Sequence, residues 1–351
     1  MEILSENKEE EIHVLMVALS SQGHINPMLR LGKRLVNKGL HVTLATTEFT
    51  RRRMLKSSTI NPTASSISIS GVQVRFFSDG QNLDYDGKIN VDSYMENLAN
   101  FGAITDVAIS HGIPCAMVWI QPCSLFAIYY RFYNKLSSLP TLTDPEMSVE
   151  LPGLPLLRAE DLPSYLLPSN PFGSLPKLLS DMFQNMKKYK WVLGNSFFGL
   201  ERDAIESMAD LCPISPIGPL VPPSLLGEDE DHDSGTVEMW KREDTCIEWL
   251  NKEAPSSPTN AKLIADIFRN GLRLRANQDG IVSNEEVEKC IREIMDGPKS
   301  VELKSNAREL RVAAREAVAG AGSSDKNIQL FVDEIIRSCG SIVKGSCNDT
   351  S

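Results

Sequence analysis

The hydrophobic pattern of the N-terminal part of the chain predicts strands and helices in alternation. The aliphatic run 13–19 is typical of a strand buried on both faces, and Met28, Leu31 and Leu35 then recur at helical spacing. Further runs predict strands at 40–46, 72–77 and 113–119, helices at 92–111 and 124–133, and a loop at 58–71. Strands that alternate with helices in this way form a parallel sheet with right-handed crossovers.

The turn after the first strand carries a candidate catalytic group. Residues 20–27 are Ser-Ser-Gln-Gly-His-Ile-Asn-Pro; we predict Asn26 as the N-cap and Pro27 as the first helical residue, because proline has no N–H to leave unpaired there. His24 then lies in a turn at the carboxyl end of a strand, where doubly wound sheets bind ligands. The turn contains one glycine, whereas the pyrophosphate-binding loop of a dinucleotide site has three, so this turn is a poor candidate for such a site. A solvated loop histidine is the alternative interpretation.

The C-terminal third of the chain is predicted to be helical. Ser283 and Glu286 have the spacing of a capping box, and Gly297 with Pro298 ends the helix that follows. Two more helices are predicted, at 301–318 and after Asp325, together with one short strand at 271–274. The apolar stripes of the first and last helices consist of Val287, Ile291 and Ile294 and of Ile328, Phe331, Val332 and Ile335.

Composition and charge argue against several classes of function. The 351 residues are enough for two domains, with 42% hydrophobic and 23% charged residues. A net charge of −10 argues against nucleic acid or an anionic membrane as the main partner, and no apolar run reaches the length of a membrane span. Seven scattered cysteines and an acidic start predict a cytoplasmic protein with reduced thiols and no metal site. The acidic run 227–233 is interpreted as a solvated linker rather than a metal site.

The first strand, the turn and the helix after it resemble the start of the plant UDP-sugar-dependent glycosyltransferases that act on small natural products. Further segments that resemble this family lie at 151–155, 160–164, 191–197, 216–220 and 246–250. The resemblance implies an α/β protein of the GT-B type, with a Rossmann-like, parallel-sheet N-terminal lobe and an incomplete, mostly helical C-terminal lobe. It implies an enzyme that transfers a sugar, usually glucose, with inversion from UDP-sugar to a small hydroxyl or carboxyl acceptor, without a cofactor.

The resemblance also implies a domain organisation. It assigns 1–11 to a disordered N-terminus, 12–222 to an acceptor-binding domain and 223–240 to an acidic linker. Residues 241–338 form a truncated donor-side domain, and 339–351 a tail. The partners implied are the acceptor and UDP-sugar, and no particular oligomeric state follows.

By the same resemblance, His24 is the general base that deprotonates the acceptor hydroxyl. Histidine has an ordinary pKa of about 6.5, so its neutral ring accepts a proton near neutral pH. The residues implied to line the acceptor side are Ser21, Gln22, Gly23, Trp119 and Gln121. For Trp119, plain core packing is an equal alternative.

Two parts of the family pattern are absent from the sequence. Near 100–104 the family has a strand whose aspartate orients the catalytic histidine, but here a helix continues to Asp106, which matches a later family aspartate and does not take that role. Between Ser257 and Pro258 about a hundred residues with the sugar-nucleotide signature are missing. This segment supplies the family's Trp for uracil, His for pyrophosphate and Asp-Gln pair for sugar, so we identify no donor-binding residue.

Three hypotheses are therefore left open. The chain is such an enzyme, impaired or inactive; it is a non-catalytic remnant that binds acceptors or a partner; or it is a mis-spliced product without function. The missing donor signature favours the last two. No G-x-G-x-x-G follows a strand, which argues against a nicotinamide enzyme. We also expect the C-terminal third to be loosely packed, because its apolar stripes lose the sheet on which they would pack.

Overall fold

Two compact units, interleaved in sequence, make up the computed structural model. It describes residues 11–56, 66–78, 100–139, 147–167, 173–226, 237, 258–275, 277 and 281–346. Unit 1 combines 1–85, 220–242 and 326–351, and unit 2 combines 86–219 and 243–325. The domain ranges expected from the sequence stay a prediction, since these units group segments by contact and not by chain order.

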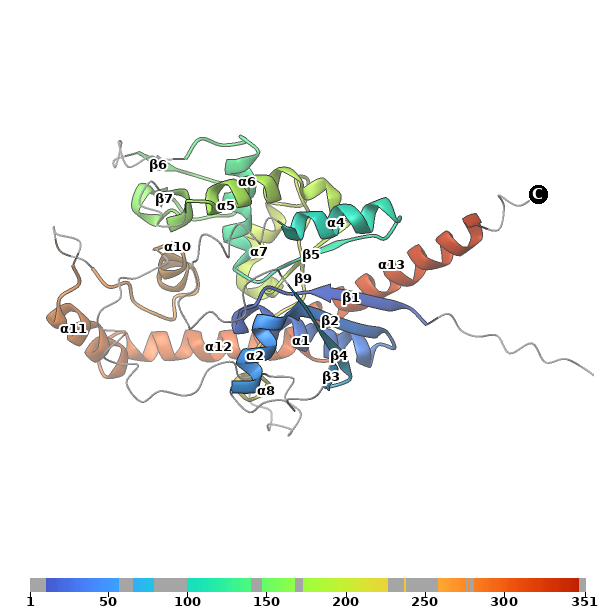
Figure 1. Ribbon diagram of the computed structural model, residues 1–351. Coiled ribbons are helices and arrows are strands. Elements are labelled where there is room, and N and C mark those ends of the chain that lie inside the picture. Colours follow the sequence, from blue (N-terminus) through green and yellow to red (C-terminus); the bar gives the residue numbers. More distant parts are fainter. Residues whose placement is uncertain are drawn as a thin grey trace, which may run out of the picture. The chain divides into compact units, whose positions relative to one another are not determined.

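A four-stranded sheet forms the centre of unit 1 (Figure 1). Strands β1 (His13–Val17), β2 (His41–Thr47) and β4 (Val72–Phe77) run parallel, and β3 (Ser66–Ile69) pairs antiparallel with β4. The three predicted parallel strands are thereby confirmed. The loop predicted at 58–71 is wrong for 66–69, because the alternation Ser-Ile-Ser-Ile has the period of a strand and places both isoleucines opposite valines of β4.

Helix α1 (Gln22–Asn37) packs on β2 and β4 of this sheet. Gly32 allows the close approach, because a Cβ there would lie 2.8 Å from a methyl group of Val72. Unit 1 also contains α2 (Glu48–Lys56), α8 (Pro223–Leu226) and most of α13 (Ser323–Ser346). The predicted stripe of α13 is buried, with exposed fractions of 8% or less, so the predicted loose packing is wrong for this helix.

Unit 2 has a three-stranded parallel sheet in the order β5-β8-β9, formed by Ala116–Trp119, Trp191–Gly194 and Ser215–Pro216. A two-stranded antiparallel pair, β6 (Ser148–Val149) and β7 (Leu157–Arg158), lies beside the short 3₁₀ turn η1 (Ala159–Asp161). The helices in this part of unit 2 are α4 (Asn100–Ser110), α5 (Cys123–Tyr133), α6 (Leu175–Gln184) and α7 (Phe198–Glu206), with single 3₁₀ turns at Ser164–Leu166 and Met186–Lys188.

Aromatic side chains fill the core of unit 2, and a buried carboxylate orders it. The rings of Phe126 and Tyr129 each contact those of Phe183 and Trp119, and Phe183 also contacts Trp119, at ring-centroid distances of 5.3–6.2 Å. Glu201 accepts hydrogen bonds from the backbone N–H of Cys123 and Ser124, each at 2.9 Å. This carboxylate caps the N-terminus of α5, which begins with a proline N-cap that offers no side-chain acceptor.

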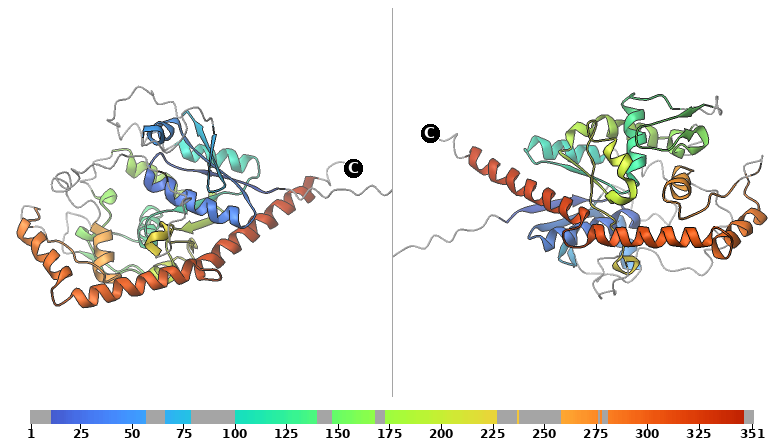
Figure 2. Two further views of the ribbon diagram at one scale, coloured as in Figure 1. Left: turned by 90° about the horizontal axis from the view of Figure 1, so that it is seen from below. Right: turned by 180° about the vertical axis from the view of Figure 1, so that it is seen from behind.

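The described residues of unit 2 from 258 onward are mostly helical, as predicted. After α10 (Pro258–Lys262) and the π-turn Leu263–Ile267 come α11 (Asn284–Met295) and α12 (Ser300–Val318), which lie end to end in both views of Figure 2. The Ser283 hydroxyl accepts from the backbone N–H of Glu286 at 3.3 Å, which confirms one half of the predicted capping box, while the Glu286 carboxylate accepts from the Arg275 N–H at 3.3 Å. The strand predicted at 271–274 is wrong: residues 271–275 are described and contain no strand.

The predicted loose packing of the C-terminal third is correct for one helix only. None of the 12 residues of α11, all of them described, is buried. In contrast, α12 buries Leu303, Ala314 and Ala317 and contacts α7. Predicted features at 92–99, 227–233 and 246–250 lie outside the described residues.

Among the strands described, β1 is an edge strand of the sheet in unit 1, and β5 is an edge strand of the parallel sheet in unit 2. Leu15 of β1 is 63% exposed, whereas β2 buries five of its seven residues.

Candidate functional site

The predicted base lies in the first turn of α1 and not in the turn before it. Helix α1 begins at Gln22 with Ser21 as its N-cap, and the Ser21 carbonyl accepts from the backbone N–H of both His24 and Ile25 at 2.9 Å. The prediction that Asn26 caps the helix and Pro27 opens it is therefore wrong. Pro27 lies inside the helix, where it lacks the N–H that would donate to the carbonyl four residues earlier.

Two hydrogen bonds with Val237 explain why Asn26 is not the N-cap of the helix. Its amide donates to the Val237 carbonyl at 3.1 Å and accepts from the Val237 N–H at 2.9 Å. Arg30, one turn later on α1, donates to the Leu220 carbonyl at 3.1 Å. Sequence reasoning missed this role: both contacts join residues about 200 positions apart, and the only local signal is a polar residue on an otherwise apolar helix face.

Buried hydroxyl groups hold the segment before His24 against β2. The hydroxyls of Ser20 and Thr47 lie 2.5 Å apart, and those of Thr46 and Thr50 lie 3.0 Å apart. All four residues are at most 5% exposed. Hydrogen-bonded groups with this burial define the path of the backbone, so they orient the first turn of α1 at the carboxyl end of β1.

The His24 imidazole is half-buried, and one of its nitrogens is enclosed without a partner. Within the described residues, Nδ1 has no hydrogen-bond partner. Burial lowers the pKa of His24 below its ordinary value of 6.5. The ring is therefore neutral at pH 7, the state that a general base requires, but no acceptor in the described part of the chain decides which nitrogen carries the proton.

The structure brings together four of the six residues predicted for the site. Ser21, Gln22, Gly23 and His24 share the N-terminal turn of α1 in unit 1, whereas Trp119 and Gln121 belong to unit 2. Gly23 is exposed, and a Cβ there would have only one neighbour, the Ser21 hydroxyl at 3.9 Å. Nothing in this turn therefore requires a glycine on steric grounds.

Trp119 is part of the core of unit 2. It is 8% exposed, its ring meets Phe126, Tyr129 and Phe183 edge-on, and its Nε1–H donates to the Pro122 carbonyl at 2.9 Å. This geometry favours the packing interpretation of Trp119. Gln121 is exposed after the end of β5, and its role in acceptor binding stays a prediction.

Asp106 does not serve as a partner for a histidine in the structure. It lies within α4 and forms an ion pair with Lys188 at 2.6 Å, with both side chains well exposed. This contact agrees with the prediction that Asp106 does not take the histidine-orienting role.

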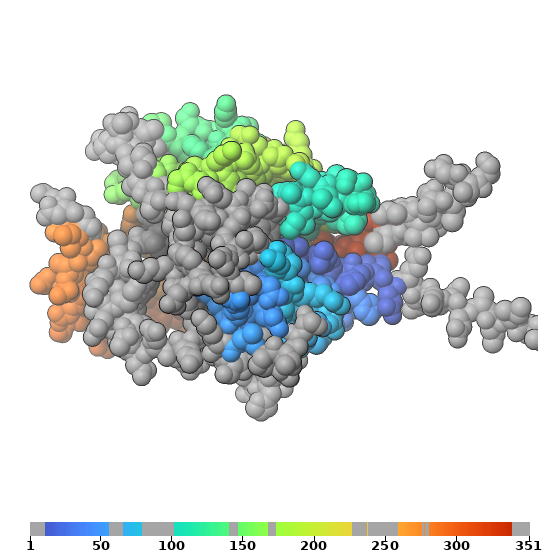
Figure 3. Space-filling view, viewed as in Figure 1, coloured from blue at the N-terminus to red at the C-terminus, as the bar shows by residue number. Residues whose placement is uncertain are grey.

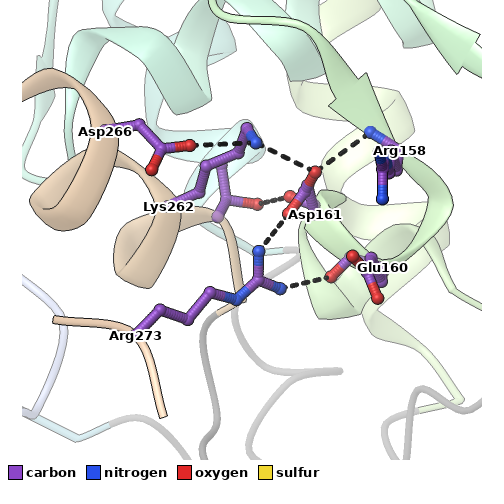
Figure 4. A network of polar contacts seen from close by, with 7 residues as sticks. Arg158, Glu160, Asp161, Lys262, Asp266 and Arg273 are labelled. Carbon is purple, nitrogen blue, oxygen red and sulfur yellow. Dashed lines mark hydrogen bonds and ion pairs between the residues drawn. The ribbon is translucent and has the colours of Figure 1, made fainter. Parts of the chain in front are cut away.

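A second polar cluster lies in unit 2 around Asp161, a residue only 1% exposed (Figure 4). Its carboxylate contacts the Arg273 guanidinium, the Lys262 ammonium at 3.2 Å and the backbone N–H of Arg158 at 3.1 Å. The Thr259 hydroxyl donates to the Asp161 carbonyl at 2.6 Å. Three of these contacts, from Thr259, Lys262 and Arg273, thus fasten residues 259–273 to the turn η1.

The charges of this cluster balance one another, which indicates a structural role. The contacts of Asp161 with Lys262 and Arg273 are called the clamp. Burial alone would raise the pKa of Asp161, but the hydrogen bonds from Arg273 and the Arg158 N–H, together with the Lys262 charge, outweigh it and hold the pKa below its ordinary value. Lys262 also pairs with Asp266 at 3.1 Å. The cations are thus already matched by carboxylates, so the cluster is not built to bind an anion.

Neither a metal site nor a membrane-spanning helix is found among the described residues. Among these residues, no group of three or more His, Cys, Asp or Glu side chains is arranged to hold a metal ion. No described helix is long and apolar enough to span a membrane.

Comparison with curated proteins gives relatives that span nearly the whole chain. UDP-glycosyltransferase 84B2 of Arabidopsis thaliana is 33% identical over 447 positions, which cover 91% of this chain and 99% of the relative. Gallate 1-beta-glucosyltransferase 84A24 of Punica granatum is 29% identical and covers 94% of the chain and 90% of the relative. No protein-family model matches the chain.

The same alignment shows that this chain is shorter inside the matched region. Since 91% of 351 residues is about 319, about 128 of the 447 aligned positions have no residue in this chain. The predicted truncation is confirmed in extent, and its placement between Ser257 and Pro258 stays a prediction.

Solved structures agree on the fold. Os79 of O. sativa in complex with UDP has a TM-score of 0.71 at 20% identity, and the match covers 92% of this chain and all of that one. A glucosyltransferase of Polygonum tinctorium that acts on indoxyl has a TM-score of 0.67 at 17% identity. These neighbours confirm the predicted GT-B-like α/β architecture.

Proposed function

Because the chain belongs to the plant UDP-glycosyltransferase family, we propose that its N-terminal turn of α1 is the acceptor-activating part of an inverting sugar transfer, with His24 as the general base. The observation that carries this proposal is the neutral, half-buried imidazole of His24, fixed in the first turn of α1 by the contacts before it. The sugar transferred is glucose, the group named for several relatives, and the acceptor is a small molecule with a hydroxyl or carboxyl group.

In this reaction His24 removes the proton of the acceptor hydroxyl as the acceptor oxygen attacks the anomeric carbon of the sugar. The bond from that carbon to the phosphate oxygen breaks, UDP leaves, and the configuration inverts. The base is Nε2, because Nδ1 is enclosed. Nε2 accepts a proton only in the tautomer that carries hydrogen on Nδ1, and an acceptor at Nδ1 is what normally selects that tautomer.

We further propose that turnover by this chain is strongly impaired. Within the described residues no acceptor contacts Nδ1, so neither the active tautomer nor the imidazolium formed in the reaction is stabilised. About 128 positions of the aligned relative are also missing, and we infer that they include the segment that positions the sugar nucleotide. Loss of base strength and loss of substrate positioning both raise the barrier to the chemical step.

The loss of base strength affects hydroxyl acceptors more than carboxyl acceptors. A hydroxyl acceptor must lose its proton to the base, whereas a carboxyl acceptor with a pKa of about 4 is already ionised at pH 7. Gallate and cinnamate, named for two relatives, both carry a carboxyl group. We therefore propose carboxylates as the acceptor class to which the remaining site is best suited.

The second candidate function is acceptor binding without catalysis. The orienting contacts of Ser20, Thr47 and Ser21 are complete in the structure, so the acceptor side is ordered even though about 128 aligned positions are absent. A protein of this kind would bind benzoate-like ligands and release them unchanged.

One assay separates the two candidates. Purified protein is incubated with radiolabelled UDP-glucose and a panel of flavonoid and benzoate acceptors, and acceptor binding is measured in parallel by calorimetry. We expect binding without acceptor-dependent glucoside formation. Glucoside formation that His24→Ala abolishes would refute the proposed impairment and establish the enzyme directly.

His41→Ala provides the matched control for His24→Ala. His41 is the first residue of β2, its side chain is 57% exposed, and its contact with Glu11 at 3.4 Å lies at the opposite end of the strand from Thr47. Loss of acceptor binding in both variants would reflect a general effect on folding. Loss in the His24 variant alone would support the proposed site, and binding unchanged in both would remove His24 from it.

A further inference from the structure

We propose that α11 is a self-association surface, on which a second copy of this chain packs its own α11 in antiparallel orientation. The surface, called the α11 face, consists of Val287, Ile291, Ile294 and Met295. The proposal goes beyond glycosyl transfer and does not depend on it.

The α11 face is apolar and uncovered. Ile291, Ile294 and Met295 are 55%, 37% and 56% exposed, and none of the twelve residues of α11 is buried. With Val287 they recur at intervals of three and four residues, so they lie on one side of the helix. The orange atoms of this segment lie at the surface of the molecule on the side seen in Figure 3. The comparable stripe of α13 is buried, which makes the exposure of α11 a specific feature and not a general one.

The size of the face fits a weak, specific contact. Three large aliphatic side chains about half exposed, together with Val287, present on the order of 300 Å², the size of the largest apolar patch on a typical monomer, which is often functional. Two copies would bury about 600 Å² from the face and more from its charged flank, still below the roughly 1,200 Å² of a stable complex. We therefore expect an association that depends on protein concentration.

The charges beside the face determine the orientation. Glu288 and Arg292 lie one turn apart on its flank, are 61% and 78% exposed, and form an ion pair with each other at 2.5 Å. In an antiparallel pair with its twofold axis at residue 290, Glu288 of one copy lies opposite Arg292 of the other. In a parallel pair the twofold axis runs along the helices, so the flank that carries Glu288 and Arg292 would face the opposite flank of the other copy and these two charges would not meet across the contact.

The net charge of α11 argues against a membrane surface as the binding partner of the α11 face. Around the face α11 carries Glu285, Glu286, Glu288 and Glu293, against Lys289 and Arg292. Amphipathic helices that bind anionic lipid surfaces are rich in lysine and arginine on the polar face. The net negative charge of α11 therefore favours a protein partner.

Analytical ultracentrifugation of the full chain in reducing buffer, from about 1 to 200 µM, tests the proposal. We expect a monomer at the low end and a growing fraction of dimer at the high end. Ile291→Glu should weaken the association by at least about tenfold, because the symmetric contact buries two new charges. Val312→Glu is the matched control: Val312 is 53% exposed on α12, outside the α11 face, and its replacement should leave the association unchanged.

Charge reversal tests the antiparallel orientation. Glu288→Arg and Arg292→Glu should each weaken the dimer, since like charges then face each other, and the double variant should restore it to within about threefold. Circular dichroism confirms that each variant remains helical. A monomer at every concentration would overturn the proposal, as would a dimer that Ile291→Glu leaves intact or a double variant that stays weak.

Cross-linking tests whether the two copies contact each other through α11. Cys290 lies next to Ile291 and is partly buried. A short bis-maleimide should therefore join Cys290 of one copy to Cys290 of the other. Dimers whose cross-links map only to other cysteines would refute the α11 contact.

Discussion

Replacing Asp161 by asparagine tests whether the clamp fastens the C-terminal segment to unit 2. Asparagine keeps the size of the side chain and an oxygen that accepts from the Arg158 N–H, now at 3.1 Å. The Thr259 contact is to the backbone carbonyl and also remains. The substitution thus removes the negative charge and little else.

The expected loss of stability, as free energy of unfolding of the segment, follows from the burial of the charged groups involved. Hydrogen bonds to charged groups contribute about 1.5–3 kcal/mol each. Asp161 is 1% exposed, but the side chains of Lys262 and Arg273 are 15% and 33% exposed, and Lys262 keeps its contact with Asp266 at 3.1 Å. Since both cations remain partly hydrated, we expect a total loss of about 2 kcal/mol, below the cost of breaking a fully buried pair.

Hydrogen exchange of the segment 258–275 measures this loss directly. A loss of about 2 kcal/mol in local stability raises the exchange of protected amides by about 30-fold. Amides of β8 in the same unit should change less, because their sheet does not depend on the clamp. The matched control is Asp106→Asn, which removes an exposed ion pair with Lys188 and should cost less than about 0.5 kcal/mol.

The effect should also depend on pH in a defined way. Because the folded pKa of Asp161 is lowered, its contribution is fully present above the ordinary carboxyl value of 3.8 and is lost as the pH falls through the folded pKa. Wild type and Asp161→Asn should therefore differ at pH 6 and converge below about pH 4. Equal exchange of 258–275 in both proteins at pH 6 would show that the clamp does not hold this segment.

Three further outcomes are expected. If the missing segment is restored from a longer transcript, His24→Ala should lower kcat for a hydroxyl acceptor by at least about a hundredfold, and a rate near that of the restored parent would exclude His24 as the base. In the chain as it stands, any residual transfer should favour benzoate over flavonoid acceptors at pH 7, and a preference for flavonoids would contradict the proposed carboxylate class. Amides of α11 should exchange far faster than those of Val42–Leu44 on β2, since α11 has no buried residue; equal protection would mean that α11 has a packing partner not seen here.

The sequence alone was sufficient for the elements whose signals are local. Runs of aliphatic residues located β1, β2 and β4 to within two residues, and the spacing from Ser283 located the start of α11. The resemblance of residues 20–27 identified the family, which the relatives confirm. These predictions succeed because hydrophobic periodicity and capping depend on neighbours within a few positions.

What the sequence could not determine depends on residues far apart along the chain. Asn26 has the chemistry of an N-cap, but its amide pairs with Val237, 211 positions away, and the helix starts four residues earlier. Trp119 was equally compatible with a pocket or a core until Phe183 and Tyr129 were seen to enclose it. A buried polar group takes whichever partner the fold brings near it, and only the tertiary structure specifies that partner.

The two helical stripes of the C-terminal third show the same division. Both have the periodicity of a buried face, and the sequence predicted each correctly as a helix. The tertiary structure covers the stripe of α13 and leaves that of α11 exposed. An amphipathic pattern specifies that a face is apolar, but whether the face is buried depends on the surface that the rest of the chain supplies, and here about 128 positions of the aligned relative are absent.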